Sequence, residues 1–131
     1  MDTDAILNQL RERVPTLAAV YLFGSRASGD ATDDSDLDLA VAFDGPADPV
    51  RLWTLASDLE NLSGCPVDLL DFRRASTVMQ YRILTTGTRL WSRGADVDIY
   101  ESFVLSAKTE LDEARAGVIA DIERTGTIHG R

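Results

Sequence analysis

Hydrophobic and polar positions along this chain of 131 residues alternate between strand-like and helix-like spacing. Residues 17–23, LAAVYLF, form a continuous apolar run of strand length, and residues 36–43, DLDLAVAF, alternate with a period of two. The segment PVDLLDF, residues 66–72, predicts a third strand, and TRLWS, residues 88–92, a brief strand or extended segment. The core face of the second strand would carry Leu37, Leu39, Val41 and Phe43.

Between these strands, apolar residues recur every three or four positions, as they do on one face of an amphipathic helix. The spacing predicts a first helix that ends at Pro15, a second from Pro49 to about Ser63 and a short third one within residues 76–87. It also predicts a long helix over about residues 97–124. The apolar positions of this last helix are Tyr100, Phe103, Val104, Ala107, Leu111, Ala114, Val118 and Ile122.

Strands that alternate with helices favour an α/β or α+β fold, with a small mixed β-sheet and helices packed on one face. The length and the 44% hydrophobic content suit a single domain over residues 1–131. The face of the second strand that carries Asp36 and Asp38 would then be the uncovered one.

Composition narrows the functional classes. The net charge of -9 argues against a protein that binds nucleic acid through its phosphates, and it favours a basic partner or a cation. A single cysteine, Cys65, excludes an internal disulfide and suits the cytoplasm. We expect no membrane association, because no apolar run reaches the length of a bilayer span.

Asp36 and Asp38 are the first candidate site residues. Side chains two apart on a strand project to the same side, so these carboxylates would lie close together and repel each other. A divalent cation removes this conflict, and carboxylate oxygens suit Mg²⁺. Upstream, Gly24 and Ser25 follow the first strand, where a small hydroxyl and free backbone N–H groups can hold a phosphate. The two features together indicate a nucleoside triphosphate site.

The joint pattern is Gly24-Ser25, ten residues, then Asp36-x-Asp38 at the start of an alternating strand. In this pattern the sequence resembles the nucleotidyltransferase superfamily that includes DNA polymerase beta and the aminoglycoside nucleotidyltransferases. The resemblance spans about residues 17–92 and implies the nucleotidyltransferase fold. It also implies that Ser25 contacts the triphosphate of ATP and that Asp36 and Asp38 bind metal.

The resemblance further implies a third carboxylate on a neighbouring strand. Asp68 has the strand parity that would place it on the face of Asp36 and Asp38, whereas Asp71 has the opposite parity, and we prefer Asp68. The roles of two arginines stay open. Arg26 either neutralises the triphosphate or pairs with Asp30, Asp33 or Asp34. Arg82 either reaches the nucleotide or the partner, or is solvated.

The short chain narrows the resemblance to the minimal nucleotidyltransferases, the MntA-type antitoxins paired with HEPN-type ribonuclease toxins. The segments YLFGSRASGDATDDSDLDLAV and VDLLDFRRAS carry this likeness. It implies Mg²⁺-dependent transfer of AMP from ATP to a tyrosine of the toxin. Two alternatives remain: an antitoxin that acts by binding and occlusion alone, and a small-molecule nucleotidyltransferase with a separate acceptor-binding subunit.

Overall fold

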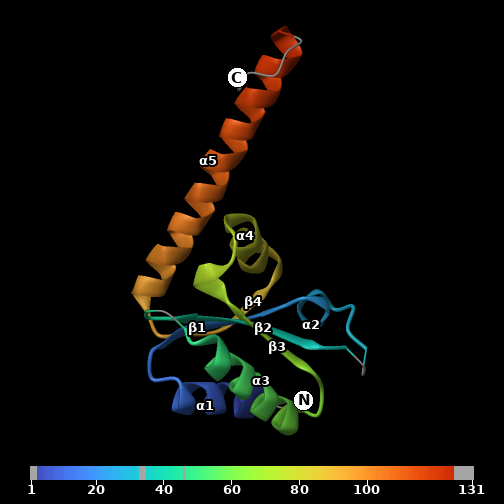
Figure 1. The fold of residues 1–131 in the computed structure, drawn as a ribbon, viewed down its shortest axis with the longest axis vertical. Helices are drawn as coiled ribbons and strands as arrows, with labels where there is room; N and C mark the ends of the chain where they lie inside the picture. The colour runs from blue at the N-terminus through green and yellow to red at the C-terminus, as the bar shows by residue number, and fades with distance from the viewer. Residues whose placement is uncertain (1–2, 33–34, 46, 126–131) are drawn as a thin grey trace.

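The computed structural model describes residues 3–32, 35–45 and 47–125 of the chain. Helices and strands alternate along most of its length, and a long helix closes it (Figure 1). The elements are α1 (Thr3–Arg13), β1 (Leu17–Phe23), α2 (Ser25–Ser28), β2 (Leu37–Phe43), α3 (Pro49–Ser63), β3 (Val67–Asp71), the 3₁₀ turn η1 (Phe72–Arg74), α4 (Thr77–Thr86), β4 (Thr88–Ser92) and α5 (Ala95–Thr125).

The strands form one mixed sheet in the order β3-β2-β1-β4. Strand β1 pairs antiparallel with both β2 and β4, and β2 pairs parallel with β3. The parallel pair is joined through α3, the kind of helical crossover that parallel neighbours require. The segment 88–92, predicted as a strand or an extended segment, is therefore an edge strand of the sheet.

Helices cover both faces of this sheet, which corrects the prediction that they pack on one face only. Helices α1 and α3 lie on one side, and α4 with the start of α5 lies on the other (Figure 1). The pattern of β2 does not reveal the second layer, because that face carries Asp38 and the small apolar residues Ala40 and Ala42, which give a weak core signal. The mixed sheet and the long final helix are confirmed.

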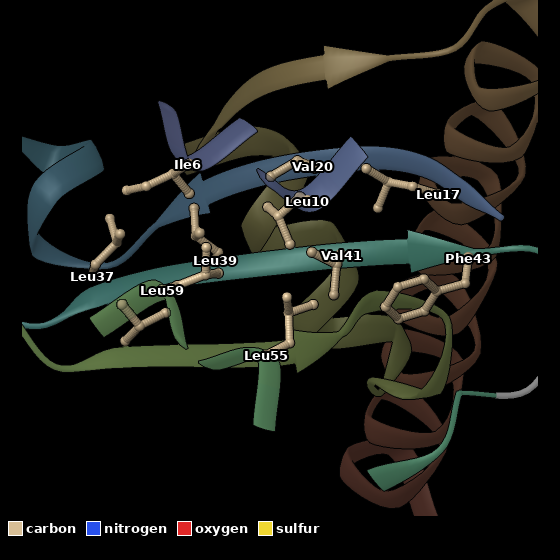
Figure 2. Close-up of a cluster of buried hydrophobic side chains, with 11 residues drawn as sticks. Ile6, Leu10, Leu17, Val20, Leu37, Leu39, Val41, Phe43, Leu55 and Leu59 are labelled. Carbon is tan, nitrogen blue, oxygen red and sulfur yellow. The ribbon is translucent and has the colours of Figure 1, made fainter. Parts of the chain in front are cut away.

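The larger core lies between the sheet and the α1–α3 layer. Figure 2 shows its side chains converging from β1, β2 and the two helices. All four residues predicted for the core face of β2 belong to it, which confirms the period-two pattern. The buried members are Ile6, Leu10, Leu17, Val20, Leu37, Leu39, Val41, Phe43, Leu55, Leu59 and Val67.

The second core is smaller and more aromatic. Tyr21 stacks on Phe72 with their ring centroids 4.7 Å apart, and Tyr100 of α5 meets the edge of Phe72 at 6.2 Å. The Tyr21 hydroxyl donates a 2.6 Å hydrogen bond to Glu101, and Arg89 bridges Glu101 and Asp98. These contacts fasten the first turns of α5 to the sheet.

Among the residues that the structure describes, no helix is both long enough and apolar enough to cross a bilayer.

Candidate active site

Asp36, Asp38 and Asp68 come together at one end of the paired strands β2 and β3. In the parallel register Asp38 lies opposite Asp68, so the two side chains share a face of the sheet. Asp36 immediately precedes β2 and is exposed. Asp71 lies opposite Val41, whose side chain belongs to the α1–α3 core, and therefore projects to the other face. The register thus places Asp68, and not Asp71, beside Asp38.

Gly24 brings the turn after β1 against Asp38. Its backbone has φ 73° and ψ -157°, a conformation that only glycine adopts readily. A Cβ atom at this position would lie 2.2 Å from the Asp38 Oδ2 atom. The missing side chain therefore leaves the space that the Asp38 carboxylate occupies. Ser25 follows directly and begins the single helical turn α2.

Electrostatic repulsion is concentrated on Asp38. Partial burial raises the pKa of its carboxyl above the usual 3.8, and the negative charges of Asp68 and Asp36 raise it further. In addition, Phe23 is the antiparallel neighbour of Asp38 on β1 and supplies no counter-charge. The site thus presents an excess of negative charge that a cation would neutralise.

The donor set fits a hard divalent cation, because it consists of carboxylate oxygens on one face of two adjacent strands. Within the described parts of the chain, however, no three acidic, histidine or cysteine side chains are already gathered as a metal cluster. The negative charges of Asp68 and Asp36 nevertheless act on Asp38, and side-chain rotation changes the spacing of carboxylates at little cost. The three carboxylates are near one another without being preassembled.

Arg26 holds the segment that leads into β2. Its Nη2 donates to the Ser35 carbonyl at 2.6 Å and its Nε to the Asp36 carbonyl at 3.2 Å. Both acceptors are backbone oxygens, so neither bond is the pairing with a loop carboxylate that the sequence suggested as one alternative. Of the suggested partners, Asp30 bonds to Ser28, and Asp33 and Asp34 lie outside the described residues. Nucleotide binding by Arg26 stays a prediction.

A pocket of about 410 Å³ opens beside Gly24, between α2 and α4. This volume lies in the range of about 300–1,000 Å³ that is usual for small-molecule sites. Its apolar lining comes from Phe23, Met79 and Ile83, and its polar groups come from both helices. The lining residues are Phe23, Gly24, Ser28, Met79, Arg82, Ile83 and Thr86. Arg82 therefore faces the same pocket as the glycine turn, although its side chain is exposed.

A second pocket, of about 270 Å³, lies on the opposite side of the sheet between α1 and α3. Arg13, Phe43 and Arg51 are among its lining residues, and none of the six predicted site residues is. Its position on the far face of the sheet separates it from the carboxylates.

Apart from Arg82, sequence reasoning missed the residues of α4 that line the pocket. The spacing of Met79, Ile83 and Thr86 indicates only a short amphipathic helix, and Ser28 shows no more than a polar residue after Ser25. The available signal was the place of α4 in the chain. Helices α1 and α3 already fill one face of the sheet, so a helix after the third strand had to pack on the other face.

Comparisons with known proteins agree with this geometry. A family model described as "Polymerase beta, Nucleotidyltransferase" matches residues 5–100. The chain is 33% identical over 122 residues to a protein of Shewanella oneidensis named protein adenylyltransferase MntA, covering 93% of this chain and 88% of that protein.

Two solved structures extend the likeness to three dimensions. A toxin-antitoxin structure with AMP-PNP superimposes with a TM-score of 0.81 and 32% identity, covering 94% of this chain and 99% of that chain. An MNT antitoxin from Shewanella oneidensis, solved in complex with a tri-AMPylated HEPN toxin, gives a TM-score of 0.73 and 32% identity, covering 92% of this chain and 94% of that chain.

Proposed function

The chain belongs to the polymerase beta nucleotidyltransferase family, and we propose that it is a protein adenylyltransferase antitoxin that transfers AMP from ATP to a tyrosine of a HEPN-type ribonuclease toxin. The observation that carries the proposal is the convergence of Asp36, Asp38 and Asp68 beside the Gly24 turn and the α2–α4 pocket. The relatives described above supply the class of acceptor.

We place the triphosphate of ATP at the turn formed by Gly24 and Ser25. Ser25 directly follows the glycine that lies against the Asp38 carboxylate, and Gly24 allows close approach of the backbone. We place the nucleoside in the adjacent pocket, whose apolar lining of Phe23, Met79 and Ile83 suits a base. The Arg82 guanidinium, at the edge of this pocket, is available to an anionic or hydroxyl group of the nucleotide.

The three carboxylates would hold Mg²⁺, which when bound neutralises the triphosphate and lowers the cost of deprotonating the attacking hydroxyl. Asp36 and Asp38 are its proposed ligands, and Asp68 is the third. Asp68 is exposed on the edge strand β3 and is therefore also the group best placed to accept a proton from an incoming side chain.

In the reaction, the tyrosine oxygen of the toxin forms a bond to the α-phosphorus of ATP. The bond between that phosphorus and the bridging oxygen of pyrophosphate breaks, and the phenolic proton passes to Asp68. The chain's residues act by holding the triphosphate and the attacking oxygen in line, which is the main contribution of proteins to phosphoryl transfer. The AMP attached to the tyrosine would block the ribonuclease site of the toxin.

The net charge of -9 supports a basic protein surface as partner in place of RNA. Cys65 is a free thiol, which is compatible with a reducing compartment, and we place the reaction in the cytoplasm.

The test is the intact mass of the HEPN-type toxin after incubation with this protein, ATP and Mg²⁺. We expect one or more adenylyl additions with the wild type, and at least about a 100-fold slower reaction with Asp36→Asn, because the substitution removes one ligand charge. A toxin that is neutralised by the wild type and by Asp36→Asn alike, without a change in mass, would instead favour occlusion.

A further inference from the structure

Helix α5 has an apolar stripe that continues past the part of the molecule that covers it. Val97, Val104, Leu111 and Val118 follow one another at intervals of seven residues, the spacing of a coiled-coil seam. Val97 and Val104 are buried, with 3% and 5% of their surface exposed, and Val97 belongs to the core that the sheet and α4 form. Val118 has the same position on the helix and is 57% exposed, and Ile119 beside it is 55% exposed.

The apolar stripe changes from buried to exposed where α5 runs beyond α4. Tyr81 of α4 still contacts α5, since the Lys108 Nζ lies 5.0 Å from its ring centroid, and Leu111 is half-buried. From Asp112 to Ala120 every residue is exposed. Figure 1 shows this upper half of α5 running beyond α4 into open space.

Such a projecting helix lacks the tertiary packing that normally stabilises a helix, because isolated helices of fewer than about 12–15 residues are marginal in water. Its apolar seam continues an interface that is filled by α4 one turn below. The geometry therefore suits a helix of another protein, packed on α5 as a continuation of the α4–α5 contact.

We propose that the projecting half of α5, through Leu111, Val118 and Ile119, is the docking surface for a basic amphipathic helix of the protein that the active site modifies. This inference rests on the proposed function. A second copy of the chain is disfavoured, because two molecules of charge -9 repel each other. Over residues 110–115, this part of α5 carries three carboxylates, those of Glu110, Asp112 and Glu113, against the single guanidinium of Arg115 beside the seam, and this acidic excess suits basic residues on the partner.

The position of the seam agrees with this role. Helices α4 and α5 lie on the face of the sheet that carries Ala40 and Ala42, which is also the face of Asp38. A helix seated on α5 beside α4 would lie on the active-site side of the molecule. The rest of the partner could then reach the carboxylates without crossing the sheet.

The test compares two double variants of the projecting helix. Val118→Gln with Ile119→Gln removes the apolar stripe, while Ala116→Gln with Ala120→Gln places the same side chains away from it. All four positions are exposed, and glutamine is a good helix former, so both proteins should fold. The dissociation constant for the purified HEPN-type toxin is measured by titration calorimetry, and AMP transfer is measured at limiting and at saturating toxin.

We expect the stripe variant to bind the toxin about ten-fold or more weakly and to recover transfer at saturating toxin. The control variant should bind as the wild type does. Equal affinity of both variants overturns the docking surface, as does a wild-type dimer in sedimentation velocity that only the stripe variant loses. If the toxin binds and the stripe variant loses that binding, but no AMP is transferred by the wild type, the proposed function fails and the surface stands. A wild type that binds no toxin contradicts both.

Discussion

At the scale of single residues, Asp38 joins the turn after β1 to the paired strands β2 and β3. Gly24 leaves room for its carboxylate, and Asp68 and Asp36 act on its charge. Because the folded protein raises the pKa of Asp38, the folded state holds that proton more tightly than the unfolded chain does. The free energy of unfolding therefore falls as pH rises from 3.8 through the folded pKa. A residue kept ionised at such a cost is typical of a functional site.

Asp38→Asn should consequently stabilise the protein at neutral pH while it abolishes transfer. The gain in the free energy of unfolding should stay below about 1 kcal/mol, because solvent screens the half-exposed carboxylate. Urea denaturation measures it. Glu110→Gln, which removes an exposed carboxylate from α5, should change stability by less than about 0.5 kcal/mol. An Asp38→Asn protein less stable than the wild type would contradict the repulsion described here.

Gly24→Ala tests the contact between the turn and Asp38. The new methyl group would displace the carboxylate and strain the backbone, so we expect about 1–3 kcal/mol of destabilisation and at least about 100-fold slower transfer. Gly29→Ala is the matched control, because Gly29 also has a positive φ, of 86°, but a methyl group there would meet no atom within 4 Å. It should lose stability through strain and keep its activity. Equal loss of activity in both variants would point to backbone strain alone.

Sequence reasoning went furthest where the period of a strand decides the outcome. The alternation of residues 66–72 implied that Asp68 and not Asp71 faces Asp38, and the register of β2 and β3 has that arrangement. The roles of these residues in catalysis stay predictions. The bonds from Arg26 to the Ser35 and Asp36 carbonyls had no signal in the sequence, because any segment supplies carbonyl acceptors and only the folded loop determines which ones lie within reach.

At the scale of elements, the attachment of α5 to the sheet determines where the long helix points. Tyr21, in the middle of β1, donates a hydrogen bond from its hydroxyl to Glu101, and Arg89 of β4 bonds Glu101 and Asp98. Burial, followed by the bond to Glu101, raises the pKa of the Tyr21 phenol well above its usual value of 10.0. These polar contacts with β1 and β4 hold the base of the helix together with the packing of Val97 and Tyr100 in the second core.

Tyr21→Phe should lower the free energy of unfolding by about 1–3 kcal/mol, because it removes a partly buried hydrogen bond to a charged group. The bond contributes in full below pH 10.0, where the phenol is protonated in both states. Above that pH the unfolded phenol ionises first, so wild-type stability falls and its difference from Tyr21→Phe should shrink. Urea denaturation near neutral pH and at about pH 11 measures this difference. A difference that grows with pH would contradict the assignment.

The long helix was predicted well in extent and less well in its faces. Apolar spacing placed it at about residues 97–124, and it spans Ala95–Thr125. Phe103, expected on the packed face, is 69% exposed, whereas Val104 beside it is buried. The apolar spacing of this helix is compatible with more than one buried face. Only contact with α4 and the sheet determines which face is buried. The covered second face of the sheet was missed because Ala40 and Ala42 give a weak core signal.

At the scale of the whole molecule, the fold leaves the two sides of the sheet with different tasks. The α1–α3 side holds the main apolar core, while the α4–α5 side holds the carboxylates, the pocket and the projecting helix. The net charge of -9 is spread over a chain of only 131 residues, so association with a basic partner should be fast and sensitive to salt. The residues of the main core and the residues proposed to act in the reaction therefore lie on opposite faces of one small sheet.

In the proposed reaction, the AMP moiety of ATP becomes covalently attached to the toxin. The most direct measurement incubates this protein, Mg²⁺ and the HEPN-type toxin with ATP labelled either at the α-phosphorus or at the γ-phosphorus, and follows the label on the denatured toxin. We predict label from the α-position only, lost when Asp36 is replaced by asparagine. Label from the γ-position, or no label on a toxin that is nevertheless neutralised, would contradict the account.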